Sequence, residues 1–178
     1  RIWLLSEHGL SHNGAVKYLA LLKKVVNRAV ANNKIAFSPF AAYKLERQEV
    51  SPDFLNEDEL RRIINFNSPL PRLERTRDMF LFACYTGLSY VDVKTLRAEH
   101  LERDNEGRIW IKKKRIKTGV LARIPLLPSA KMLIDKYSGG DTLIPIYSAK
   151  DINLYLKDIA ILCHIDKRIT YHTARHTF

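Results

Sequence analysis

Residues 79–92, MFLFACYTGLSYVD, decide how the larger part of this chain folds. The first six side chains would be apolar on every side of a helix, and a helix of that kind is buried among other elements. Gly87 then predicts the end of this helix, because glycine adopts the left-handed conformation without steric strain. Ser89 and Asp92 have the spacing of an N-cap residue and the third residue of a new helix. The stretch therefore predicts a buried helix, a turn and a short second helix.

Further helix signals precede and follow this stretch. Asn56 lies three residues before Glu59, which is the spacing of a capping box. Residues 44–52 are polar and show no sustained period, so we interpret them as a linker. Helices are expected at residues 11–32, 56–66, 72–85, 128–137 and 148–162, and another begins near residue 170.

The helix expected at residues 11–32 has two distinct faces. Ser11 is its predicted N-cap. Apolar residues recur at helical spacing and predict one buried face. This face consists of Ala15, Tyr18, Leu19, Leu22, Val25, Val26 and Ala29. Away from it, Lys17, Lys24 and Arg28 form a basic stripe, which is either a DNA contact or an ordinary solvated face.

The middle of the chain changes period. Residues 108–112 alternate between polar and apolar side chains, and residues 121–126 do so in part, which is typical of strands. Lys117, Thr118 and Gly119 lie between these stretches and predict a β-hairpin. The chain as a whole is therefore predicted to be mostly α-helical with one small antiparallel β-sheet, an α+β fold.

The charge of the chain is strongly basic. Its 178 residues include 30 Lys or Arg and 19 Asp or Glu, which gives a net charge of +11. Such an excess suggests a polyanionic partner, nucleic acid before a membrane surface, although a solvated basic surface is the alternative. No apolar run approaches the roughly 18–20 residues that span a bilayer. The two cysteines, Cys84 and Cys163, lie in apolar stretches and are predicted to be buried and reduced.

The predicted hairpin is the most basic segment. No acidic residue occurs from residue 108 to residue 119, whereas six cations do: Arg108, Lys112, Lys113, Lys114, Arg115 and Lys117. Because strand side chains alternate in direction, Arg115 and Lys117 share one face and Lys114 takes the other. A ribbon of cations suits a DNA groove or backbone, so Lys112, Lys113 and Lys114 are candidate DNA contacts. The alternative is that lysines protect an edge strand from aggregation.

His172 and Arg175 lie three residues apart at the start of the last predicted helix. This spacing puts the imidazole and the guanidinium on one face, where together they can hold a phosphate. His172 and His176 also have the spacing of a zinc-binding helix. The position that holds the general-base glutamate in zinc metalloproteases is Thr173, however, so no metal site is predicted.

The order of these motifs resembles a known family. The sequence TGL followed by Asp92, then KTG and IPL in the hairpin, then HTARHTF at 172–178, resembles the catalytic domain of tyrosine recombinases, the phage-integrase family. Within this family, the sequences TGLSYVD and KTG followed by IPLLP are most similar to the integrases of conjugative transposons. The segment 11–47 resembles the end of the helical, SAM-like core-binding domain. The resemblance implies two parts: residues 1–48 from that domain with a linker, and residues 49–178 from the catalytic domain.

The resemblance implies DNA cleavage without a metal or cofactor, through a 3′-phosphotyrosyl link to the enzyme. By position, Arg175 would clamp the phosphate in bidentate fashion and His172 would donate a hydrogen bond or a proton. Lys117 would be the general acid for the leaving 5′-oxygen. Asp92 would be the acidic residue that supports the site.

Two departures from the family pattern are visible. The family has an arginine directly after TGL, where this chain has Ser89, and we hypothesise that Arg115 replaces it because it shares a strand face with Lys117. The nucleophilic tyrosine follows the His-x-x-Arg helix in the family, whereas Tyr147, Tyr155 and Tyr171 precede Arg175 here. The 178 residues are therefore expected to be truncated before the nucleophile, and to bind DNA without cutting it.

The implied partner is double-stranded DNA, on which four protomers of the family join two duplexes, while this fragment is expected to be monomeric. The implied location is the bacterial cytoplasm, in association with the nucleoid and not with a membrane. Two alternatives remain open: a non-catalytic architectural or regulatory DNA-binding protein with the same fold, and a type IB topoisomerase with similar chemistry.

Overall fold

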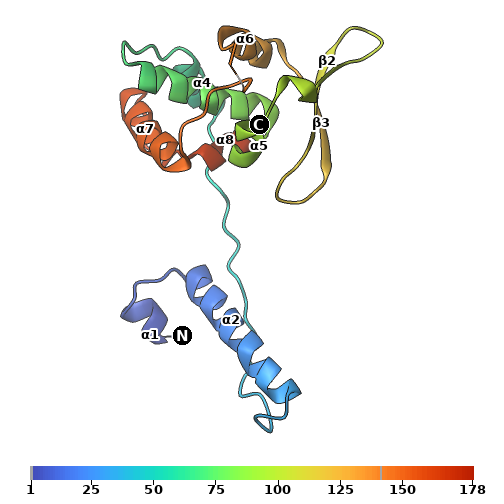
Figure 1. Cartoon of the computed structure of the whole chain (residues 1–178). Coiled ribbons are helices and arrows are strands. Elements are labelled where there is room, and N and C mark those ends of the chain that lie inside the picture. The colour runs from blue at the N-terminus through green and yellow to red at the C-terminus, as the bar shows by residue number, and fades with distance from the viewer. Residues whose placement is uncertain (1, 141) are drawn as a thin grey trace. The chain divides into compact units, whose positions relative to one another are not determined.

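The computed structural model describes residues 2–140 and 142–178, and the chain divides into two compact units, Arg1–Ser51 and Pro52–Phe178 (Figure 1). The first unit contains α1 (Ile2–Ser6) and α2 (His12–Ala31). The second contains α3 (Glu57–Ile64), α4 (Pro71–Thr86), α5 (Tyr90–Lys94), the short 3-10 helix η1 (Ala98–His100), β1 (Leu101–Arg103), β2 (Ile109–Lys114), β3 (Leu121–Pro125), α6 (Pro128–Lys136), α7 (Ala149–Leu162) and α8 (Tyr171–Thr177).

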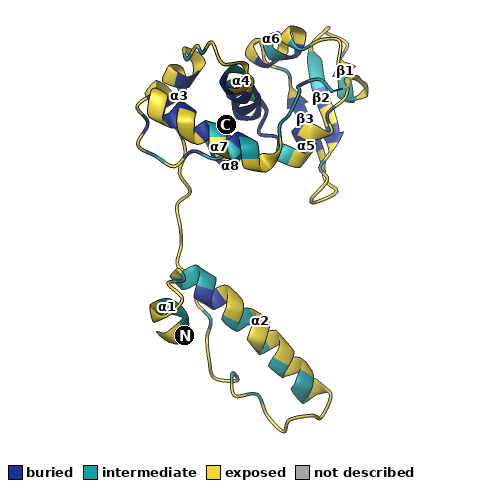
Figure 2. Cartoon of the chain, turned by 60° about the vertical axis from the view of Figure 1, so that its left-hand side comes forward, coloured by how far each residue is buried: buried dark blue, intermediate teal, exposed yellow. Residues whose placement is uncertain are grey.

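Helix α2 begins as predicted, but its apolar face is only partly covered. The Ser11 hydroxyl accepts a hydrogen bond from the backbone N–H of Gly14 at 3.2 Å. Tyr18, Leu22 and Val25 are 57%, 49% and 67% exposed, so the prediction that they are buried is wrong (Figure 2). The physical reason is that, within the described residues of this unit, α1 and the segment after α2 are the parts that can pack against the helix, and they are too small to cover its apolar face.

Helix α4 is the centre of the second unit. It packs against α6, α7 and α8, and its buried side chains include Met79, Phe80 and Phe82 (Figure 2). Full burial of each such side chain stabilises the fold by about 1.5–3 kcal/mol. Gly87 ends the helix with φ at 59°, as predicted. A Cβ atom there would lie 2.9 Å from the Phe178 ring, so close packing as well as backbone conformation requires glycine.

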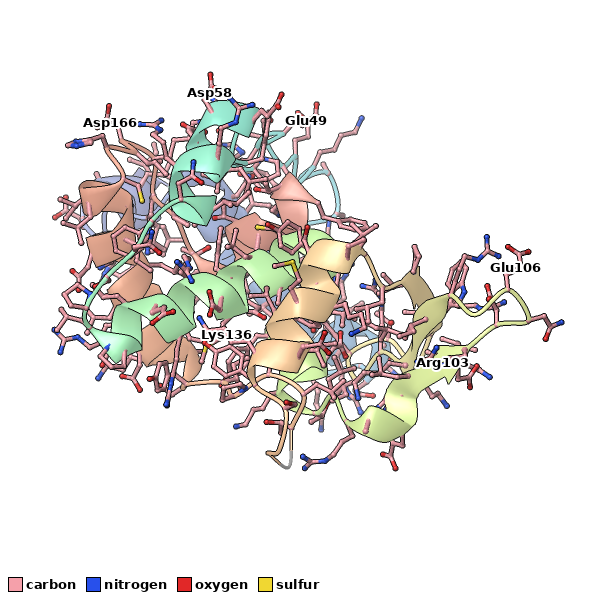
Figure 3. All side chains as sticks on the ribbon, turned by 90° about the horizontal axis from the view of Figure 1, so that it is seen from above. Glu49, Asp58, Arg103, Glu106, Lys136 and Asp166 are labelled. Carbon is pink, nitrogen blue, oxygen red and sulfur yellow. The ribbon has the colours of Figure 1, made fainter. Side chains whose placement is uncertain are left out.

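The predicted hairpin is present as β2 and β3, and the fold class is confirmed. The strands pair antiparallel with Ile111 opposite Ile124. A third strand, β1, pairs antiparallel with the other edge of β2 and was not predicted, because three residues are too few to show an alternating pattern. Arg103 and Glu106 lie at the end of the sheet that projects from the helices (Figure 3).

Both predicted cysteine environments are confirmed, since Cys84 and Cys163 are buried free thiols. Across the described residues, every helix is too short or too polar to cross a lipid bilayer.

Candidate active site

One pocket of about 560 Å³ in the second unit collects residues from distant parts of the sequence. The turn into α5, the loop between β2 and β3, and α8 all contribute to its lining. The predicted site residues that line it are Asp92, Arg115, Lys117, His172 and Arg175, together with Ser89. The five residues predicted to form the catalytic site therefore lie around one concave surface.

Asp92 connects two walls of the pocket. It is buried, and its Oδ2 accepts a hydrogen bond from the Ser89 hydroxyl at 2.7 Å. Its Oδ1 accepts one from the backbone N–H of Ile116 at 3.0 Å. Ser89 is the N-cap of α5, as predicted, so this single carboxylate ties the start of α5 to the tip of the β2–β3 hairpin.

The hairpin tip is a tight loop that carries Arg115 and Lys117. Strand β2 ends at Lys114, so these two cations lie in the loop and the prediction that they share a strand face is wrong. The backbone N–H of Arg115 donates to the carbonyl of Val120, and the N–H of Gly119 donates to the carbonyl of Arg115, both at 2.8 Å. Gly119 has φ at 70°, a conformation that favours glycine. The loop thereby closes on itself while Arg115 and Lys117 extend into the pocket.

Helix α8 is held in place by the residue directly before His172. The Tyr171 ring is buried and meets the Tyr90 ring edge to face at 5.8 Å. Its backbone N–H donates to Asn153 Oδ1 on α7 at 2.9 Å. With this helix fixed against α4 and α7, His172 and Arg175 present the same face to the pocket. Burial also raises the pKa of the Tyr171 phenol.

The pocket has an excess of unpaired positive charge. Among the residues that the structure describes, Arg115, Lys117 and Arg175 have no ion-pair partner. Burial lowers the pKa of His172 below the ordinary value for histidine, and neighbouring basic groups lower it further. These groups are His176, whose ring centroid is 4.7 Å away, Arg175 and Lys117. A concave site with several unpaired cations is suited to bind an anion such as a phosphate.

The three predicted DNA-binding lysines of the hairpin have different environments. Lys113 is only 5% exposed, and its Nζ donates to the carbonyl of Thr95 at 3.0 Å. The prediction that Lys113 is a surface DNA contact is therefore wrong: it faces the covered side of the sheet. Lys112 is exposed but forms an ion pair with Glu102 at 3.0 Å. Lys114 is exposed, and its role stays a prediction.

The basic stripe of the first unit also stays a prediction. Lys17, Lys24 and Arg28 are exposed on α2. Two further residues that line the pocket, Thr118 and Val120, were not predicted. Both lie within two residues of Lys117 or Gly119, so their place in the hairpin loop was the signal that could have identified them.

Comparison with known proteins gives two family matches. The Phage integrase family matches residues 53–178, and the Phage integrase SAM-like domain matches residues 1–45. A search of curated protein sequences finds no match.

Several solved structures have the same fold. A lambda integrase dimer bound to a COC′ core site is 21% identical with a TM-score of 0.77, covering 97% of this chain and 65% of that one. A post-cleavage complex of the XerH site-specific recombinase with difH DNA is 16% identical with a TM-score of 0.75, covering 98% of this chain and 57% of that one. The Tn1549 transposon integrase with circular-intermediate DNA is 17% identical with a TM-score of 0.73, covering 98% and 67%. The chain spans roughly half to two thirds of the length of these structures.

Proposed function

Because the chain belongs to the phage integrase family, we propose that this protein is a site-specific tyrosine recombinase that cuts and rejoins duplex DNA during integration or excision of a mobile element. The observation that carries the proposal is the shared pocket, in which Lys117, His172 and Arg175 line one concave surface although 58 positions separate Lys117 from Arg175. Solved structures of similar fold are complexes with DNA, which supports duplex DNA as the ligand.

The proposed reaction is a phosphoryl transfer that needs no cofactor. The phenol of a tyrosine loses its proton to solvent water and its oxygen attacks phosphorus. A new P–O bond forms to the tyrosine, and the bond to the 5′-oxygen breaks. The leaving oxygen takes a proton from Lys117 and departs as a 5′-hydroxyl. Negative charge builds on the nonbridging oxygens, where the Arg175 guanidinium and a hydrogen bond from His172 stabilise it. Asp92 positions the hairpin that carries Lys117.

We assign Arg115 as the second phosphate-binding guanidinium. The position that holds this arginine in the family pattern is Ser89, whose hydroxyl is hydrogen-bonded to Asp92 and carries no charge. Arg115 lines the same pocket and has no ion-pair partner among the described residues. A lysine cannot reproduce its planar, bidentate geometry. In the full-length protein, Arg115→Ala and Arg115→Lys should therefore both abolish cleavage, and near-normal cleavage by either would remove this assignment.

The nucleophile is not assigned within the 178 residues. None of the described residues that line the pocket is a tyrosine, and the Tyr171 phenol is buried. We propose that the nucleophilic tyrosine lies beyond Phe178 and that residues 1–178 alone bind DNA without cutting it. The same observation favours the second candidate function, a non-catalytic DNA-binding protein of this fold.

The two units would divide the task of holding DNA. We propose that residues 1–48 are the end of a helical core-binding domain with its linker, and that Lys17, Lys24 and Arg28 contact the DNA backbone. Residues 49–178 would be the first part of the catalytic domain. The similar lambda integrase structures are a dimer and a tetramer on DNA, which supports self-association of the full-length protein on its DNA site.

The binding step is tested by the salt dependence of affinity for a short duplex. Each phosphate contact that is lost reduces the slope of log affinity against log salt by about 0.9. Lys117→Ala and Arg175→Ala should each lower the slope by that amount. Lys131→Ala is the matched control, because it removes the same charge from α6, outside the pocket. Equal slopes for all four proteins would overturn the pocket as a phosphate site.

The catalytic step is tested with the full-length protein and nicked duplex DNA. A recombinase should accumulate a covalent protein–DNA complex linked through a 3′-phosphotyrosine, and Arg175→Ala should prevent it. Salt-sensitive binding without any covalent complex would favour the non-catalytic alternative. Relaxation of supercoiled DNA without strand exchange would favour a type IB topoisomerase.

A further inference from the structure

Two more hollows lie next to the candidate active site. The first, of about 280 Å³, shares His172 with that site and is also lined by His176 and Arg168. The second, of about 520 Å³, shares Arg168 with the first and is also lined by Lys157. Because each hollow shares a lining residue with the next, the three are neighbours on the surface of the second unit. We call the two added hollows the α7–α8 track. Its basic groups are His172, His176, Arg168, Lys157, His164 and Lys167.

The cations of the track differ in whether the protein already satisfies them. Lys167 is occupied, because its Nζ lies 2.7 Å from Glu59 Oε2 and donates to the carbonyl of Phe54 at 3.2 Å. Within residues 2–140 and 142–178, by contrast, Arg168 and Lys157 have neither an ion pair nor a side-chain hydrogen bond. These two exposed cations are therefore available to an anion from outside.

The second hollow also has an apolar part. Ile161, which is 72% exposed, and Ile165 line it together with Lys157 and Arg168. Cations next to exposed apolar carbon suit a nucleic-acid backbone, in which each phosphate is flanked by sugar carbons.

We infer that the DNA strand whose phosphate enters the candidate active site continues along the α7–α8 track, with its neighbouring phosphates on Arg168 and Lys157. This inference rests on the proposed function, because the active-site pocket sets where the strand begins. It adds two DNA-contacting residues, Arg168 and Lys157, to the proposed active site, and neither belongs to a motif recognised in the sequence. An acidic protein segment is the competing ligand, and it is an outcome of the test below.

The track is also lined by carboxylates. Removing one of them should raise the affinity for DNA, whereas removing a cation should lower it. Asp53 lines the first hollow and Asp166 the second. If a phosphate backbone passes here, Asp166 repels it. Asp166→Asn should then strengthen duplex binding, whereas removal of a carboxylate elsewhere should not. Asp135 on α6 is the matched control, since it lines neither hollow.

The experiment measures the affinity of residues 1–178 for a random-sequence duplex of about 20 base pairs over a series of salt concentrations. Arg168→Ala and Lys157→Ala should each reduce the slope of log affinity against log salt by about 0.9, and Arg168→Lys should keep the slope because it keeps the charge. Asp166→Asn should raise the affinity severalfold. Lys131→Ala and Asp135→Asn should leave the slope within about 0.3 of the parent protein.

The outcomes separate the two proposals. If Lys117→Ala and Arg175→Ala reduce the slope while Arg168→Ala and Lys157→Ala do not, the strand path is wrong and the proposed function stands. If none of the four reduces it, the proposed function itself fails. If Arg168→Ala leaves DNA binding intact but weakens self-association of the full-length protein, the track binds protein and the inference is overturned. Inorganic phosphate provides a further check: as a single phosphate it should respond to Lys117→Ala and not to Arg168→Ala.

Discussion

Asp78 and Asp92 are both buried in the second unit, and the groups around them differ in charge. Asp78, on α4, is surrounded by cations. Its Oδ1 accepts from Arg77 Nη2 at 2.7 Å, and its Oδ2 accepts from Lys136 Nζ at 2.8 Å and from the Tyr137 hydroxyl at 2.7 Å. Figure 3 shows Lys136 on α6, beside α4. The cluster uses its cations to connect α4 and α6.

Asp92 is satisfied by neutral groups instead. Its two oxygens accept hydrogen bonds from the Ser89 hydroxyl and the Ile116 backbone N–H. Arg115 and Lys117 line the same pocket but form no ion pair with it.

The comparison shows how the same chemical groups serve stability in one region and binding in the other. A buried carboxylate needs compensation, and cations supply it at Asp78. At Asp92 a hydroxyl and a peptide N–H supply this compensation. The nearby cations therefore remain unpaired and can bind an external anion. Unpaired cations that repel one another reduce stability, and this is the expected physical cost of a preformed phosphate site.

The largest expected effect is at Asp78. Asp78→Ala leaves the Arg77 guanidinium and the Tyr137 hydroxyl without their buried acceptor, so the free energy of unfolding should fall by about 3 kcal/mol. Urea denaturation followed by circular dichroism measures this loss. The salt slope of duplex binding, measured at low temperature where the variant is folded, should match that of the parent protein. A variant with full stability would show that the cluster does not hold α4 to α6.

Asp92→Ala should have a smaller and more local effect. It leaves the Ile116 N–H without its acceptor, for which we expect a loss of about 2 kcal/mol. Hydrogen exchange distinguishes this from general destabilisation: the Ile116 amide should lose protection, while amides in α4 should change only in proportion to the overall stability. If Ile116 exchanges at the parent rate, Asp92 does not anchor the hairpin.

Lys136 and Lys117 allow the structural and the binding cations to be compared with the same substitution. Lys136→Ala should lower the free energy of unfolding by about 1 kcal/mol, a modest value because the side chain is partly exposed. Lys117→Ala should leave it within about 0.5 kcal/mol, or raise it, because the substitution relieves repulsion within the pocket. Parallel urea titrations of the two variants test this. Equal losses of stability would contradict the division between structural and binding cations.

The elements that could be predicted from the sequence are those with local signals. Asn56 and Ser89 cap their helices through residues three positions later, so both partners of each interaction lie close together in the sequence. The exposed side chains of α2 and the burial of Lys113 could not be predicted in this way. Periodicity assigns a residue to a face but does not say what covers that face. In the case of Lys113, the covering groups are Thr95 and His100, which are 18 and 13 residues away.

The coming together of the candidate site residues could not be predicted from local patterns either. Spacing placed His172 and Arg175 on one helix face. Arg115 and Lys117 were paired by a strand alternation that does not extend to them, since β2 ends at Lys114, and the loop brings both into the pocket instead. Only the resemblance to a family brought the two pairs together before the structure did. The Asp78 cluster and the α7–α8 track had no family motif or local pattern. The cluster depends on a contact between α4 and α6, in which Asp78 and Lys136 are 58 positions apart in the sequence, whereas the track lies along two consecutive helices and the loop between them.

The smallest expected effect is a pH dependence of binding that comes from His172. Burial and the interactions with His176, Arg175 and Lys117 lower the pKa of His172 in the free protein. A bound phosphate offsets those interactions and raises this pKa, so the complex takes up a proton. Affinity for the duplex should therefore increase as the pH falls from 7.5 through the ordinary range of histidine, and His172→Gln should remove that part of the increase. The measurement is the pH dependence of Kd for both proteins at constant salt, where the difference between them isolates His172 from the other histidines. Parallel curves would mean that no phosphate comes close enough to change the protonation of His172. The contrast between the cations paired with Asp78 and the unpaired cations near Asp92 would then have no consequence for binding.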